Sequence, residues 1–229
     1  MSNKDVIIAL DFNSEKETLE FLDNFNYPIY VKVGMELFYK QGPSIIEKIK
    51  ANNHKIFLDL KIHDIPNTAA KAMKSLSELD IDMVNVHCAG GIEMMKAAKA
   101  MLNNEKTIII GVTMLTSTSQ KVMNEELLIP LKVQDVVLAY AKNAKEAGLD
   151  GIVCSPLEAK EVHEQLGKDF LTITPGIRYN AGQDDQIRVM TPQKAKEETC
   201  DYIVVGRPIT QSSNPKEMYE KIKGEFINE

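Results

Sequence analysis

The chain has 229 residues, of which 44% are hydrophobic and 26% are charged, and its formal net charge is −6. This composition is typical of a globular protein and excludes a disordered or fibrous chain. The acidic balance gives no support to nucleic-acid binding, which requires a basic patch or stripe. It does not exclude small anionic substrates, because a local cluster of Lys and Arg can override a negative total charge. No run approaches the roughly 18 apolar residues of a membrane span, so we expect no membrane association.

The three cysteines, Cys88, Cys154 and Cys200, show no C-x-x-C spacing. An odd and sparse set of this kind argues against a disulfide framework and favours a reducing compartment. The first residues, MSNKDVIIALDF, lack the charged, apolar and small-residue succession of a signal peptide. We therefore expect a cytoplasmic protein.

Eight short runs rich in β-branched residues recur along the chain, and longer amphipathic stretches separate them. The predicted strands cover 5–12, 29–34, 55–62, 82–88, 107–114, 151–155, 171–176 and 202–209. Helical periodicity is clear over 14–25, 43–53, 68–79, 134–148 and 215–226, and Ser14 with Glu17 forms a capping-box pattern. Continuous apolar strands alternating with helices indicate parallel strands covered on their outer side.

Eight such repeats in one chain predict a (β/α)8 barrel, for which about 250 residues is typical. The alternative is a doubly wound open sheet, which needs a glycine-rich turn after the first strand. The sequence ALDFNSEK has no glycine at that place. With no linker or compositional break, we expect a single α/β barrel domain over residues 1–229. Two longer segments, 117–131 and 177–190, depart from the repeat, and loops of this kind are often functional.

Charged residues gather where the first three predicted strands end. Asp11 follows the first strand, Lys32 lies in the second, and the third contributes Asp59, Lys61 and, just beyond it, Asp64. Barrel active sites lie at the carboxyl ends of the strands. Asp59 and Lys61 are two residues apart and therefore point to the same face of a strand. Lys32 arrives there from the neighbouring strand, which predicts a near-neutral alternating network at the barrel mouth. The next two strands add Asn85, His87, Thr113 and Thr116.

This network has two interpretations. It is either a structural salt-bridge cluster or a functional site. Desolvated charges rarely stabilise a fold more than apolar packing does, and such clusters more often mark function. The functional interpretation is favoured.

The last two strands end in an expected anion site. Glycines in TPGIR (174–178) and VVGRPI (204–209) let backbone N–H groups approach a ligand, while Arg178 and Arg207 offer planar forks suited to phosphate. Barrels often bind phosphate at these two loops. The alternative is that both glycines merely form turns.

Two histidines and two cysteines are expected to have ordinary structural roles. His54 and His163 are expected at the surface, and Cys88 and Cys154 are expected to pack in the interior. No H-E-x-x-H motif or paired Cys/His spacing is present, so we expect no metal site.

The motifs together resemble the orotidine 5′-phosphate decarboxylase family. They are ALD (9–11), VKVG (31–34), DLKIHDIPNT (59–68), MLTS (114–117), TPGIR (174–178), DQ (185–186) and VVGRPI (204–209). The D-x-K-x-x-D element alone recurs in a wider superfamily, whereas the full ordered set spans nearly the whole chain.

This resemblance implies decarboxylation of orotidine 5′-monophosphate to UMP and CO2 without metal or cofactor, by a homodimer with shared active sites. It assigns proton donation to C6 to Lys61. Asp59 would lie beside the substrate carboxylate, Lys32 would orient Asp59 and contact the ribose, and Asp64 would come from the partner subunit. The implied substrate-binding residues are Asp11, Lys32, Asp59, Ile65, Thr68, Thr116, Pro175, Arg178, Gln186, Gly206 and Arg207.

Two other functions remain open. Mg²⁺-dependent sugar-phosphate enzymes, namely 3-keto-L-gulonate 6-phosphate decarboxylase and hexulose-phosphate synthase, share D-x-K-x-x-D. They carry a Glu where this chain has Lys32, a cation that would repel Mg²⁺. A non-catalytic nucleotide sensor is the second alternative, and it would be expected to lack a member of the charged network.

Overall fold

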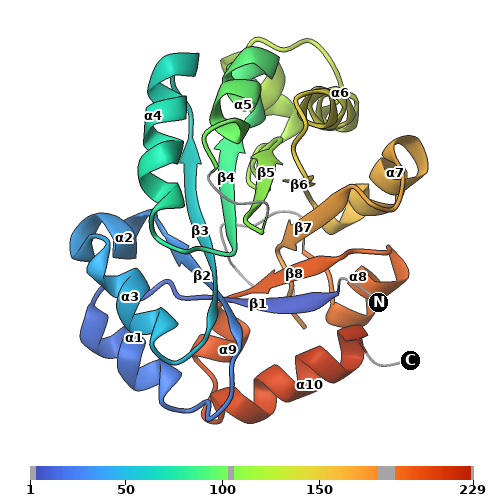
Figure 1. The fold of residues 1–229 in the computed structure, drawn as a ribbon. Coiled ribbons are helices and arrows are strands. Elements are labelled where there is room, and N and C mark those ends of the chain that lie inside the picture. The colour runs from blue at the N-terminus through green and yellow to red at the C-terminus, as the bar shows by residue number, and fades with distance from the viewer. Residues whose placement is uncertain (1–3, 103–105, 180–188, 228–229) are drawn as a thin grey trace.

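The computed structural model describes residues 4–102, 106–179 and 189–227, and eight parallel strands close into a barrel in the order β1 to β8. Figure 1 shows the helices arranged around the outside of this barrel. The strands are β1 (Asp5–Ala9), β2 (Tyr30–Gly34), β3 (Lys55–Ile62), β4 (Met83–His87), β5 (Ile108–Val112), β6 (Gly151–Val153), β7 (Leu171–Pro175) and β8 (Tyr202–Val205). The (β/α)8 prediction is confirmed.

The α-helices in the described residues are α1 (Glu15–Leu22), α2 (Met35–Gln41), α3 (Ser44–Lys50), α4 (Pro66–Ser77), α5 (Gly91–Lys99), α6 (Val133–Glu146), α7 (Pro156–Leu166), α8 (Pro192–Glu197), α9 (Arg207–Thr210) and α10 (Pro215–Ile227). Ser14 caps α1 by accepting a hydrogen bond from the Glu17 N–H. A full capping box begins α7, where Ser155 and Glu158 satisfy one another's backbone groups.

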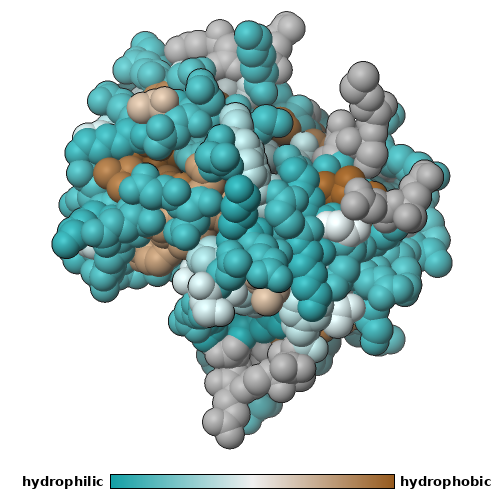
Figure 2. All heavy atoms as spheres, turned by 90° about the horizontal axis from the view of Figure 1, so that it is seen from below, coloured by the Kyte–Doolittle hydropathy of each residue, from teal (hydrophilic) through white to brown (hydrophobic). Residues whose placement is uncertain are grey.

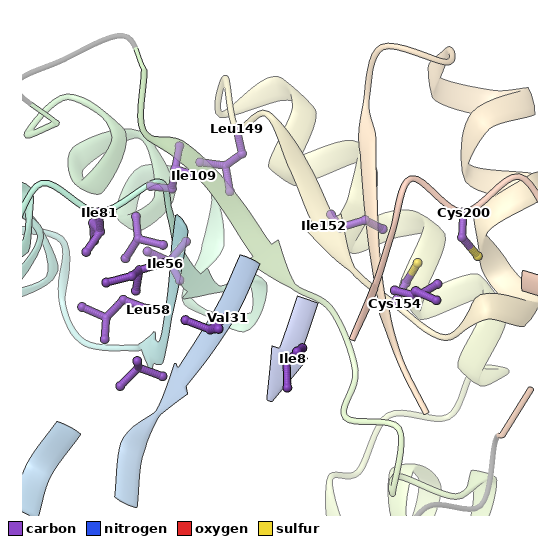
Figure 3. Packing of buried hydrophobic residues seen from close by; sticks show 14 of the residues in the cluster. Ile8, Val31, Ile56, Leu58, Ile81, Ile109, Leu149, Ile152, Cys154 and Cys200 are labelled. Carbon is purple, nitrogen blue, oxygen red and sulfur yellow. The ribbon is translucent and has the colours of Figure 1, made fainter. Parts of the chain in front are cut away.

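Side chains of each strand alternate between two hydrophobic layers. Ile7, Phe57 and Val204 belong to a cluster that fills the barrel interior. Their chain neighbours Ile8, Leu58 and Val205 belong to a larger cluster between the strands and the helices, part of which Figure 3 shows. Because both faces of each strand are buried, the strand sequences are continuous apolar runs rather than alternations of apolar and polar residues.

Six of the eight predicted strands extend too far at their carboxyl ends, while β2 and β3 end at the predicted residues. The run 202–209 ends as a strand at Val205, because Arg207 and Pro208 already begin α9. Within the longer segment 117–131, a π-helical turn covers Val122–Glu126. The other long segment, 177–190, lies mostly outside the described residues.

The two histidines expected at the surface are buried, so that prediction was wrong. The Nδ1 atom of His54 accepts a hydrogen bond from the Ile29 N–H at 3.2 Å. His163 Nε2 lies 3.0 Å from Asp201 Oδ2. Both side chains thus bind polar groups near the amino ends of strands, away from the barrel mouth.

Hydrophilic residues dominate the face of the molecule seen in Figure 2, with hydrophobic patches between them. Across the described residues, no helix is both long and apolar enough to cross a membrane.

Candidate active site

A pocket of about 310 Å³ opens where the strands end. Nine of the residues predicted for the site line it, namely Asp11, Lys32, Asp59, Lys61, Thr116, Pro175, Arg178, Gly206 and Arg207. Phe57, Val112 and Ile173 give the pocket an apolar floor that continues into the barrel interior. The pocket therefore combines a charged wall with an apolar surface on which a flat ring can lie.

The charged wall is a chain of ion pairs. Lys61 Nζ lies 2.7 Å from Asp59 Oδ1, and Lys32 Nζ lies 3.4 Å from Asp59 Oδ2. Lys32 Nζ also lies 3.3 Å from Asp11 Oδ1. The predicted alternation of cations and carboxylates at the barrel mouth is thus present in the geometry.

Ion pairing outweighs the effect of burial on the pKa values of Asp59 and Lys32. Burial by itself would raise the pKa of Asp59, but the charges of Lys32 and Lys61 and the hydrogen bonds to this carboxylate hold its pKa below the usual value. Burial would likewise lower the pKa of Lys32, but Asp59 and Asp11 keep that pKa above its usual value. Asp59 is therefore ionised and Lys32 protonated at neutral pH.

A β-bulge at the end of β3 shapes this wall. Leu58 pairs with Val84 and Ile62 pairs with Val86, so three residues of β3 lie opposite the single residue Asn85. Lys61 itself has a φ of 52°, a left-handed conformation that is uncommon for a residue with a side chain. Strained backbone of this kind concentrates at functional sites.

Asn85 is a site residue whose role could not be predicted from the sequence. Its side chain is fully buried, and its Nδ2 donates to Asp59 Oδ1 at 2.6 Å while its Oδ1 accepts from the Lys61 N–H at 2.7 Å. The spacing of polar residues on the fourth strand was visible, but the bulge that brings both charged residues to this amide was not.

The loops after β7 and β8 carry the expected anion-binding elements of the pocket. Gly176 and Arg178 follow β7, and Gly206 and Arg207 follow β8. Gly176 has a φ of 90°, so its turn favours glycine. Gln186, also expected there, lies outside the described residues.

Three predicted residues do not reach this pocket. Asp64, Ile65 and Thr68 belong to the loop and first turn that follow β3, and all three are exposed. Ile65 leaves 67% of its surface accessible, and the Asp64 carboxylate accepts a hydrogen bond from the Ile65 N–H. None of them lines the pocket of its own chain.

The other titratable groups nearby do not form a second reactive centre. The rings of His63 and His87 stack with centroids 5.2 Å apart at the rim. Burial, His63 and Lys61 lower the pKa of His87. Burial raises the pKa of the Cys88 thiol to about 12, which fits a packing role. The described residues contain no group of three His, Cys, Asp or Glu side chains arranged to hold a metal.

A closed parallel barrel with a charged pocket at the carboxyl ends of its strands is the architecture of a barrel enzyme. Residues 4–222 match the model of the orotidine 5′-phosphate decarboxylase / HUMPS family. The chain therefore belongs to this family.

Individual relatives cover the chain almost completely. An orotidine 5′-phosphate decarboxylase of Staphylococcus epidermidis is 55% identical over 97% of this chain and 98% of its own length. The crystal structure of orotidine 5′-phosphate decarboxylase from Lactobacillus acidophilus is 44% identical, with a TM-score of 0.89 over 98% of this chain and 99% of that one. The enzyme from Methanocaldococcus jannaschii, complexed with the inhibitor BMP, is 25% identical, with a TM-score of 0.79 over 98% and 99% of the two chains.

Proposed function

We propose that this protein is an orotidine 5′-phosphate decarboxylase, converting orotidine 5′-monophosphate to UMP and CO2 in de novo pyrimidine synthesis. One observation carries the proposal. The pocket of a chain in this family holds Lys61, Asp59 and Lys32 in direct contact above an apolar floor. The relatives that bear the name of this enzyme match nearly the full chain.

Lys61 is the proposed proton donor. Loss of CO2 from C6 leaves an electron pair on a vinyl carbon that the pyrimidine ring delocalises poorly. A fixed ammonium group beside C6 stabilises this developing charge and then transfers a proton to the carbon. Contact with Asp59 at 2.7 Å holds the Lys61 ammonium in place before the substrate arrives.

Asp59 contributes through differential binding. In the proposed pose its ionised carboxylate lies beside the substrate carboxylate, and the repulsion between them is relieved as CO2 leaves. An interaction that is less unfavourable in the transition state than in the ground state accelerates the reaction. Each factor of ten in rate corresponds to about 1.4 kcal/mol.

The remaining residues are proposed to bind the nucleotide. Arg178, Arg207 and the backbone at Gly206 would hold the phosphate, together with Gln186. Asp11 and Lys32 would bind the ribose, and Thr116 and Pro175 would line the base. The placement of the described members of this group around one pocket supports this assignment.

We further propose a homodimer in which each pocket is completed by the partner subunit. Asp64, Ile65 and Thr68 are exposed here and would enter the neighbouring subunit's site. Ile65 leaves an apolar side chain accessible, and burying it in the neighbouring subunit's site would stabilise the dimer through the hydrophobic effect.

The first test is the ultraviolet absorbance of orotidine 5′-monophosphate mixed with the purified protein and EDTA. A rapid spectral change would support decarboxylation without an essential divalent metal. Activity that requires added Mg²⁺, or appears only with a sugar-phosphate substrate, would favour the metal-dependent relatives instead. Tight uridine-nucleotide binding without CO2 release would favour a sensor.

The role of Lys61 has its own test. Lys61→Ala should abolish turnover while UMP binding remains measurable. Retention of more than a few per cent of the wild-type activity would contradict the assigned role of Lys61. Mixing Lys61→Ala with Asp64→Ala protein should restore activity through heterodimers with one intact site. No recovery, with subunit exchange verified, would contradict the shared site.

A further inference from the structure

The bulge in β3 brings two charged residues to one partner. In a regular ladder that continued from Leu58 and Val84, Asp59 would lie opposite Asn85, and Lys61 would lie opposite His87. Instead the pairing resumes at Ile62 and Val86, so both residues face Asn85. The bulge adds two residues to β3, an even number, and therefore keeps both side chains on the inner face of the strand.

Asn85 supplies the hydrogen bonds that the bulge removes from the ladder. Its Oδ1 accepts from the Lys61 N–H at 2.7 Å, a backbone donor that would otherwise be left without a strand partner. That contact fixes the orientation of the amide, because only the oxygen can accept. Its Nδ2 must then face Asp59, to which it donates at 2.6 Å. One buried amide thus joins the backbone of Lys61 to the carboxylate of Asp59.

We propose that Asn85 is a positioning residue that sets the geometry of the proton donor. It stabilises the left-handed conformation of Lys61 and orients the Asp59 carboxylate between the two lysines. This inference rests on the proposed decarboxylase function for its kinetic consequences, but the structural role it assigns to the Asn85 amide can be measured without activity.

Asn85→Ala removes both hydrogen bonds, and Asn85→Asp keeps the acceptor for the Lys61 N–H. Thr107→Val is the matched control, because the Thr107 hydroxyl donates one buried hydrogen bond to the Ile81 carbonyl at the start of β5, away from the pocket. All three variants would be compared with the wild-type protein in unfolding, UMP binding, turnover and hydrogen exchange of the Lys61 amide.

Asn85→Ala should lower kcat about 100-fold, the effect of a misplacement near 1 Å, with UMP affinity within threefold of wild type. The Lys61 amide should exchange faster in Asn85→Ala but stay protected in Asn85→Asp and in Thr107→Val. Asn85→Asp should also be impaired at neutral pH, because its carboxylate faces Asp59. It should regain activity relative to wild type as the pH falls and that carboxylate becomes protonated and able to donate.

A kcat of Asn85→Ala within threefold of wild type would overturn the inference, and so would unchanged protection of the Lys61 amide. If Asn85→Ala does not fold, the pH profile and amide protection of Asn85→Asp decide the question in its place. A wild-type protein without turnover would overturn the proposed function, while the amide exchange would still decide whether Asn85 holds the bulge.

Discussion

The central carboxylate of the charged network offers the sharpest test of the electrostatics. Asp59→Asn preserves the size of the side chain but removes its charge. In the wild type, Oδ1 accepts from Lys61 and Asn85 while Oδ2 faces Lys32. An amide can present an oxygen to only one of these two sides. Its NH2 group must then face a donor, whichever way it turns.

The expected cost follows from what the substitution leaves behind. Breaking a buried ion pair by removing one partner costs about 3–5 kcal/mol, because the other charge is left uncompensated. Lys32 is 13% exposed, but it keeps Asp11 at 3.3 Å, and Lys61 is 27% exposed. Both residual contacts reduce the penalty, so we expect about 3 kcal/mol of lost stability. In a chain of this size that corresponds to a fall in Tm of roughly 6–12 °C.

Urea and thermal unfolding at neutral pH measure this cost directly. The pKa of Asp59 is lowered in the folded state, so its contribution is present above the unfolded-state value near 3.8 and is lost as the pH falls through the folded value. The difference between wild type and variant should therefore shrink in strong acid. An Asp59→Asn protein at least as stable as wild type at pH 7 would refute the reasoning.

Three further substitutions test other parts of the structure. Asp150 accepts a hydrogen bond from the Ile109 N–H at 2.8 Å and pairs with Lys99 at the barrel base. Asp150→Ala should therefore lower the free energy of unfolding by about 2 kcal/mol without changing kcat. Equal urea midpoints for the variant and the wild type would contradict this. Gly34→Ala should lower kcat/KM on the order of tenfold, since its Cβ would lie 3.2 Å from Lys32 Nζ; unchanged steady-state kinetics would show that Lys32 has room to move. Burial lowers the pKa of His54 in the folded state, so the unfolded state binds more protons below about pH 6.5 and stability should fall there. His54→Asn should reduce that acid sensitivity, and an identical pH dependence of the urea midpoint would rule it out.

The barrel could be predicted because its signals are local. Each strand is a short β-branched run that is buried on both faces, and five of the eight are followed by a segment with clear helical periodicity. The carboxyl ends of strands were harder to predict. At Arg207, for example, a glycine and a proline after an apolar run do not show whether the strand continues or a short helix begins. The buried His54 and His163 were missed for a related reason. Their partners are the Ile29 backbone and Asp201, which are distant in sequence.

The residues of the charged wall were predictable, but their mutual geometry was not. Period-two spacing correctly placed Asp59 and Lys61 on one face of β3. It could not reveal the bulge or the left-handed Lys61, because both depend on pairing with β4. Asn85 therefore looked like one polar strand residue among several, although its amide contacts both charged groups.

The charges of the pocket explain why a carboxylated nucleotide would react there rather than merely bind. Lys32, Lys61, Asp11 and Asp59 together carry no net charge, so this wall offers a substrate carboxylate no net attraction. The arginines after β7 and β8 line the same pocket, and in the proposed function they hold the phosphate. In the proposed mechanism, binding energy gained at the phosphate would press the substrate carboxylate against Asp59, and loss of CO2 would remove that repulsion while the new electron pair forms beside Lys61. The closed barrel fixes the positions of the strand ends that carry both sets of residues, so in the proposed mechanism it would couple phosphate binding to the chemistry at C6.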